Sequence, residues 1–130
     1  MARGREQFKQ RQGAVAALGR PLSRRARSRC ELCDSSGTRL TPFEVAPIPE
    51  DPDPDFAVML CDRCITGATG GKLAGKEYRF LETSAWSELA PVQVVSVRLV
   101  RRLVDELKVD WASDLLDMIY LPPDVEEWLG

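Results

Sequence analysis

Four cysteines, arranged as two Cys-x-x-Cys pairs, constrain this chain more than any other feature. The pairs are Cys30-Glu-Leu-Cys33 and Cys61-Asp-Arg-Cys64, and no cysteine lies elsewhere. Two thiolates separated by two residues can face the same ion, and two such pairs complete the tetrahedral shell that Zn²⁺ takes in structural sites. The sequence therefore predicts a metal centre with Cys30, Cys33, Cys61 and Cys64 as its ligands.

The identity of the metal is a second question, for which zinc is the first choice and iron in a rubredoxin-like four-thiolate site is the main alternative. Two disulfides, free core thiols or a redox-active pair are further alternatives, and a cytosolic setting disfavours structural disulfides. The 27 residues between the pairs exceed the spacing of about 15 to 20 in the simplest zinc patterns, but a loop over Pro47–Asp55, with four prolines and four acids, accounts for the excess. Arg29 and Arg63 flank the ligands and are expected either to offset the charge of the thiolates or to be ordinary surface residues.

The absence of histidine excludes several kinds of active site. With no imidazole in the chain, a Ser-His-Asp triad, a Cys-His pair and a histidine-dependent metal nuclease cannot be built. The order of knuckle, strand, strand and second cysteine pair is that of a treble-clef or ribbon-type finger, as in the frame of HNH nucleases. Glu44-Val45-Ala46 and Ile65 stand where those nucleases place histidines, so we expect no such nuclease chemistry.

Composition predicts one soluble globular domain of 130 residues, with 44% hydrophobic and 29% charged residues. No uncharged apolar run approaches the roughly 18 residues of a membrane-spanning helix, and the charged start is not followed by an apolar segment of the kind found in secretory signals. We therefore expect a cytoplasmic protein that does not associate with a membrane.

The net charge of −2 conceals a strong asymmetry along the chain. Residues 1–30 carry +8, with Glu6 as their single acid, and the remainder carries −10. The basic residues of this N-terminal part are Arg3, Arg5, Lys9, Arg11, Arg20, Arg24, Arg25, Arg27 and Arg29. They predict nucleic acid or a protein as a partner, with self-association or docking of the arm on the acidic body as the alternatives.

Hydrophobic periodicity and breaker residues predict an α+β fold in three parts: a basic N-terminal arm (1–24), a four-cysteine zinc-ribbon region (25–82) and a helical region packed on it (83–130). Within the arm, residues 5–18 predict a weak helix or a flexible segment that ends at Gly19-Arg20-Pro21. Short strands are expected over 39–45, broken by Pro42, over 56–60 and over 78–81. Helices are expected over 91–108 and 111–120, followed by a last turn or two containing Trp128.

Several separate segments, in order, resemble the N-terminal zinc-ribbon region of the proteobacterial PhnA-like proteins, a family named for its place beside alkylphosphonate-use genes. These segments are Ala26-Arg27-Ser28 leading into Cys30–Cys33, Leu60–Cys64, Ser84–Glu88 with Pro91–Val94, Asp114–Leu121 and Trp128. The resemblance covers roughly residues 25–128 and implies zinc bound by the four cysteines, with no catalytic residue to carry over. Longer members continue into a small SH3-like β-domain that has no counterpart in these residues, and the basic arm lies outside the shared pattern.

Three functions follow as hypotheses. The first is a zinc-binding, non-enzymatic binding or adaptor protein. The second, suggested by the family name alone, is an enzyme or accessory factor of alkylphosphonate metabolism, although a metal saturated by four thiolates has no open position for a substrate or water. The third is a rubredoxin-like iron electron carrier.

Overall fold

The computed structural model describes residues 2–130. In chain order, its elements are α1 (Ala2–Ala17), α2 (Gly19–Ala26), β1 (Leu40–Glu44), the 3-10 turn η1 (Pro54–Phe56), β2 (Ala57–Cys61), α3 (Asp62–Ala68), the 3-10 turn η2 (Gly75–Tyr78), α4 (Leu81–Ser84), α5 (Ala90–Leu107), α6 (Asp110–Met118) and α7 (Pro123–Leu129). The fold thus mixes helices with one small sheet, which confirms the predicted α+β class at that level.

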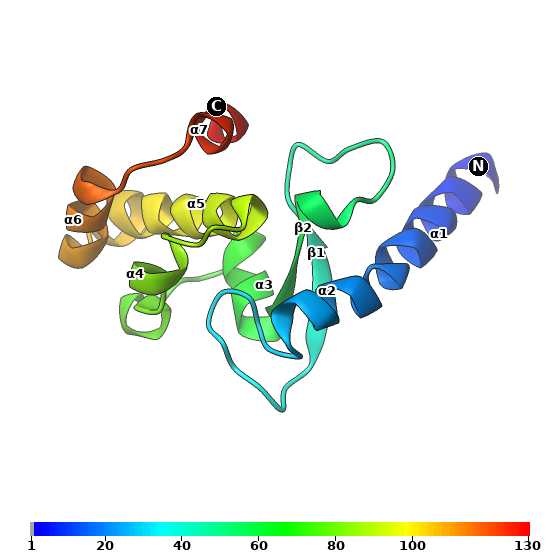
Figure 1. Cartoon of the computed structure of the whole chain (residues 1–130), viewed down its shortest axis with the longest axis horizontal. Coiled ribbons are helices and arrows are strands. Elements are labelled where there is room, and N and C mark those ends of the chain that lie inside the picture. The colour runs from blue at the N-terminus through cyan, green and yellow to red at the C-terminus, as the bar shows by residue number, and fades with distance from the viewer. Residues whose placement is uncertain (1) are drawn as a thin grey trace.

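The sheet is a two-stranded antiparallel hairpin at the centre of the molecule (Figure 1). Pairing runs from Leu40 with Cys61 to Glu44 with Ala57. The five pairs follow one another without a bulge, although a long loop connects the two strands. The predicted break at Pro42 does not occur: β1 continues through it. Pro42 pairs with Met59 from a strand that has no second neighbour, the position in which a missing N–H is tolerated.

All five residues of β2 are buried because the strand is covered on both faces. Side chains alternate between the faces of a strand: Ala57 and Met59 pack with Leu22 of α2, whereas Val58 and Leu60 belong to the larger core. The predicted strand over 56–60 is confirmed with a shift of one residue.

The predicted long helix is confirmed as α5, which contributes more to the larger core than any other helix. The N-terminal half of α5 is buried on all sides, and this includes the polar residues Gln93 and Ser96. Gln93 Nε2–H donates a hydrogen bond to Ala85 O (2.8 Å), and Ser96 Oγ–H donates one to Ser84 Oγ (2.9 Å). Lys108, in the left-handed conformation with φ 52°, ends the helix. The larger core runs from Cys30 to Val125, so the cysteine region and the C-terminal helices share one apolar interior.

One expectation about the N-terminal helix is confirmed, and one about a strand is wrong. The first helix ends at Ala17, just before Gly19-Arg20-Pro21, but a second helix, α2, which the sequence did not indicate, starts at Gly19. It holds Pro21 in its first turn, where proline loses no intrahelical hydrogen bond. The strand expected over 78–81 is absent, since η2 and α4 occupy that stretch. Tyr78 is instead buried beside α3 and donates a hydrogen bond to Arg63 O (3.0 Å).

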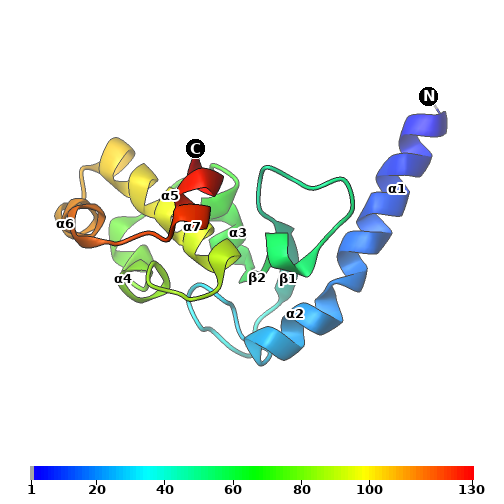
Figure 2. The same ribbon diagram turned by 45° about the horizontal axis from the view of Figure 1, so that its top comes forward.

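The molecule is elongated, with α1 at one end and α6 at the other, as Figures 1 and 2 both show. α2 lies on the hairpin, and α1 contacts β1 through Arg11 and Glu44 while its N-terminal end extends away from the body (Figure 2). The N-terminal segment is therefore helical. Across residues 2–130, no helix combines the length and the apolar character needed to cross a membrane.

Two glycine substitutions test the packing of α3 and the exposure of α1. A Cβ at Gly67 would lie 3.0 Å from the ring of Tyr78 and 3.2 Å from Leu99, whereas a Cβ at Gly13 would meet nothing within 4 Å. We expect Gly67→Ala to lower the free energy of unfolding by about 1–3 kcal/mol through overpacking. Gly13→Ala is expected to raise it by about 0.5–1 kcal/mol or to leave it unchanged, because alanine favours an exposed helix. Urea unfolding of both variants measures the difference, and equal effects would contradict the packing at Gly67.

Candidate metal centre

The four cysteines of the two Cys-x-x-Cys pairs lie together in one cluster. Their sulfur atoms all lie within 4.8 Å of one another, and those of Cys33 and Cys61 are 3.6 Å apart. Cys30, Cys61 and Cys64 are buried and Cys33 is half-buried, and none of the four forms a disulfide. The cluster can therefore hold a metal ion, as predicted, and the two-disulfide alternative does not describe this structure.

The first pair lies on a tight turn that follows α2. Asp34 N–H donates to Cys30 O (2.9 Å) and Cys30 N–H donates to Ser35 O (3.0 Å), which folds the chain back so that both thiols face one point. Asp34 has φ 63°, a left-handed conformation that aspartate adopts more readily than most residues. Glu31 N–H donates to Met59 O (2.8 Å) and so fixes the turn beside β2.

The second pair is placed by the junction of β2 and α3. Cys61 is the last residue of β2, with an extended backbone, and Cys64 lies in the first turn of α3. A helix that starts immediately after Cys61 turns Cys64 back toward it. The apolar run before Cys61 supplies the buried strand, so burial of the strand also buries the ligands.

Hydrogen bonding between two of the sulfurs shifts the pKa values of Cys30 and Cys64 in opposite directions. The hydrogen bond from the Cys64 thiol lowers the pKa of Cys30 to about 4, against the effect of burial, and backbone N–H groups of the two knuckles assist. The same hydrogen bond, together with burial and the neighbouring sulfurs, raises the pKa of Cys64. Burial also raises the pKa of Cys61. Four thiolates in this space therefore need a cation among them, because their mutual repulsion otherwise retains protons.

The two arginines that flank the ligands in sequence behave differently. Burial alone would lower the pKa of Arg63, but its hydrogen bond to Cys33 and the nearby sulfurs outweigh burial, and its pKa is raised. Its guanidinium also lies 5.3 Å from the centre of the Phe80 ring. Arg29 instead pairs with Asp34 at 3.3 Å, both side chains being exposed. Of the two, Arg63 is the one that offsets the charge of the sulfurs.

An ion pair beside the cluster was missed by the sequence analysis. Arg25 binds both carboxylate oxygens of Glu31, at 2.7 and 2.9 Å, and also donates to the carbonyls of Pro54 (2.9 Å) and Ala57 (2.8 Å). The Glu31 side chain is 4% exposed and also accepts a hydrogen bond from Met59 N–H (2.8 Å). The only sequence signal was an acid inside the first cysteine pair, a position that is exposed in most tight turns.

The basic residues of the N-terminal part (1–30) divide into anchoring and exposed residues. Arg11 binds Glu44 through two hydrogen bonds of 2.6 and 3.1 Å and donates to the carbonyls of Pro49 and Glu50, so part of the arm does dock on the acidic body. Arg25 is the second anchor. The basic side chains that are exposed and form no ion pair within the described part of the chain are Lys9, Arg20, Arg24 and Arg27. The side chains of Arg3 and Arg5 lie outside the described residues.

Comparison of the chain with protein-family models, with curated proteins and with solved structures finds no match in any of the three. The site is therefore interpreted from its own geometry.

Proposed function

We propose that the protein is a zinc-binding protein in which one Zn²⁺ is held by Cys30, Cys33, Cys61 and Cys64. The observation that supports the proposal is the convergence of these four sulfurs, three buried and one half-buried, from two separate segments. Zinc is favoured because it accepts four thiolates in a tetrahedral, closed structural site. On this proposal the turn at Cys30–Cys33, the hairpin and α3 form a treble-clef-like finger, as the order of these elements along the sequence predicts.

The metal would act on folding rather than on a substrate. Four thiolates fill the shell of a tetrahedral ion, so no position is open to water or a substrate. The cluster joins the turn at Cys30 to the start of α3, and both segments are part of the larger core. A structural ion at such a junction supplies folding free energy directly. We therefore propose a binding or adaptor protein rather than an enzyme of phosphonate metabolism.

Metal content tests this proposal. We expect one zinc per chain by elemental analysis of protein purified without added metal, and a colourless solution. Replacement by Co²⁺ should give the intense visible absorption of a tetrahedral thiolate site. Iron with a red colour would instead support the electron-carrier alternative, and protein free of metal but fully folded would contradict a structural site altogether.

The exposed arginines of α2 favour nucleic acid as the partner. Arg20 and Arg24 are four residues apart, which places them near one another on α2, and Arg27 follows as the residue that caps the end of the helix. The opposite face of α2 is fixed by Leu22, which is fully buried against Ala57 and Met59. A hollow of about 650 Å³ beside Arg20 and Arg24 has no acidic residue in its lining. Exposed arginines on a helix that is fixed to the body, with no acidic residue nearby, suit contacts to phosphates.

Salt titration with labelled single- and double-stranded DNA and RNA checks this prediction. Binding should weaken steeply with salt and show little dependence on sequence. Arg20→Gln with Arg24→Gln should reduce the slope of log K against log salt by roughly two, about one per lost phosphate contact. Lys76→Gln, an exposed control on η2, should leave the slope unchanged. If none of the four nucleic acids binds at low salt, nucleic acid is excluded as the partner, and a protein partner is the one that stays proposed.

A further inference from the structure

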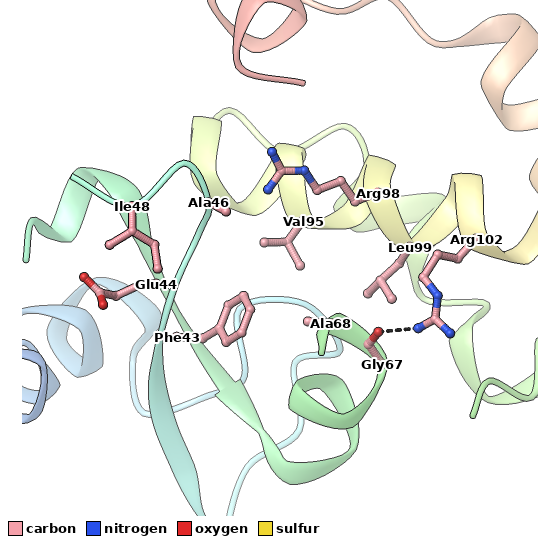
Figure 3. A pocket seen from close by; sticks show the side chains of 10 residues that line it. All are labelled: Phe43, Glu44, Ala46, Ile48, Gly67, Ala68, Val95, Arg98, Leu99 and Arg102. Atoms are coloured by element: carbon pink, nitrogen blue, oxygen red, sulfur yellow. Dashed lines mark hydrogen bonds between the residues drawn. The ribbon is translucent and has the colours of Figure 1, made fainter. Parts of the chain in front are cut away.

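A cavity of about 300 Å³ lies between the hairpin, the end of α3 and α5, apart from the cysteine cluster (Figure 3). Its apolar wall includes Phe43 from β1, Ala68 from α3, and Val95 and Leu99 from α5. At about 30 Å³ for a molecule of water, this volume corresponds to roughly ten non-hydrogen atoms. It lies at the small end of the range of cavities that bind small molecules.

Hydrogen bonds between distant segments fix the walls of the cavity relative to one another. Arg102 of α5 donates to the carbonyls of Gly67 (2.6 Å) and Gly71 (2.9 Å), which fixes the end of α3. On the opposite side, Trp128 Nε1–H donates to Ala46 O (2.9 Å) and the Trp128 ring packs on Phe56, which fixes the loop after β1. These contacts fix the shape of the cavity before any ligand binds.

Three charged side chains line the cavity, and two of them already have partners. Glu44 is bound by Arg11 through both carboxylate oxygens, and Arg102 is bound by Glu106 and two carbonyls. Arg98 is half-buried and forms no ion pair within the described residues. Its one hydrogen bond is a long contact of 3.5 Å to Trp128 O. In Figure 3 its guanidinium stands over the part of the cavity between Ala46 and Val95.

A half-buried guanidinium without a counter-ion is a site for an anion, because burial weakens its hydration and leaves its charge uncompensated. Burial and the nearby charge of Arg101 both lower the pKa of Arg98, in agreement with this environment. One uncommitted guanidinium matches one negative charge, and its planar pair of N–H donors fits a carboxylate best. The apolar wall suits an aliphatic or aromatic body.

We propose that this cavity binds a small monocarboxylate, with the carboxylate paired to Arg98 and an apolar body of roughly ten atoms lying against Phe43, Val95 and Leu99. The site is independent of the metal proposal, since none of the four cysteines lines it. It adds a small-molecule ligand to a protein whose proposed partner is a macromolecule.

Binding of octanoate and of its uncharged analogue octanamide to the full chain tests the proposal, with ¹H–¹⁵N chemical shifts as the measurement. Octanoate should bind about tenfold more tightly than octanamide, the difference expected for one charge-assisted pair. The amides of Ala68, Val95 and Leu99 should show the largest shifts. Equal affinities, no binding of either compound, or shifts confined to another surface would overturn the proposal.

Matched variants separate the charge from the cavity. Arg98→Gln should remove the preference for octanoate and leave octanamide binding unchanged, whereas Lys76→Gln, an exposed cation outside the lining, should behave as the wild type. Ala68→Phe should fill the cavity and abolish binding of both compounds. An octanoate affinity that is unchanged in Arg98→Gln would overturn the assignment of Arg98, whatever the effect of filling the cavity.

Discussion

Replacing Cys64 with serine is expected to abolish metal binding and to unfold the chain at room temperature. Cys64 is fully buried, and loss of one of four thiolates removes the closed shell that a structural zinc site requires. Structural zinc contributes about 10–16 kcal/mol of apparent free energy, which is as large as the whole stability of a typical domain, about 5–15 kcal/mol. Because Cys64 shares a core with Leu60, Leu99 and Leu115, the loss should spread into α5 and α6.

Circular dichroism and zinc stoichiometry of Cys64→Ser measure the effect. Asp62→Asn is the matched control, since Asp62 is exposed between the two cysteines of the same pair, and it should keep both the metal and the fold. A strong chelator should bring the wild-type protein to the same unfolded state. A Cys64→Ser protein with the wild-type melting temperature would show that the cluster is not what holds the core together.

Arg25→Ala is expected to lower the free energy of unfolding by about 3–5 kcal/mol, the cost of leaving a buried carboxylate without its partner. The carboxylate is that of Glu31, which is 4% exposed and lies in the sequence between the two cysteines of the first pair. Without the guanidinium, its charge adds to that of the thiolates instead of being neutralised. The carbonyls of Pro54 and Ala57 lose their donor in the same step.

A double-mutant cycle isolates this effect. Arg25→Ala combined with Glu31→Gln should recover part of the lost stability, because no buried charge then remains. Arg24→Ala, one residue earlier and exposed without an ion pair, should change stability by less than about 0.5 kcal/mol. Equal effects of Arg24→Ala and Arg25→Ala in urea unfolding would contradict the anchoring role of Arg25.

Each of the two cysteine pairs could be predicted from the sequence because the geometry within a pair is local. Cys30 and Cys33 need only a tight turn, and Cys61 and Cys64 need only a strand that ends where a helix begins. The long helix was predictable for a related reason, since Pro91 marks its first turn and Val95, Leu99 and Leu103 repeat at its period. In each case the signal lies within a few residues of the structure that it specifies.

Features that depend on distant partners could not be predicted in the same way. The charges of Arg11 and Arg25 predicted a partner for the arm, but nothing in the sequence indicates that Glu44 and Glu31 neutralise these two residues. Tyr78 was assigned to a strand because its local composition favours one. Its position is instead decided by burial beside Gly67 and by its hydrogen bond to Arg63 O.

X-ray absorption at the zinc edge of the purified chain tests the central claim most directly. Four convergent thiols predict a first shell of four sulfur atoms at about 2.3 Å and no oxygen or nitrogen ligand. The spectrum of Cys64→Ser, or of chelator-treated protein, should show no such shell. A shell with two sulfurs and two lighter atoms in the wild-type protein would contradict the claim, because it would mean that the two cysteine pairs do not share one ion.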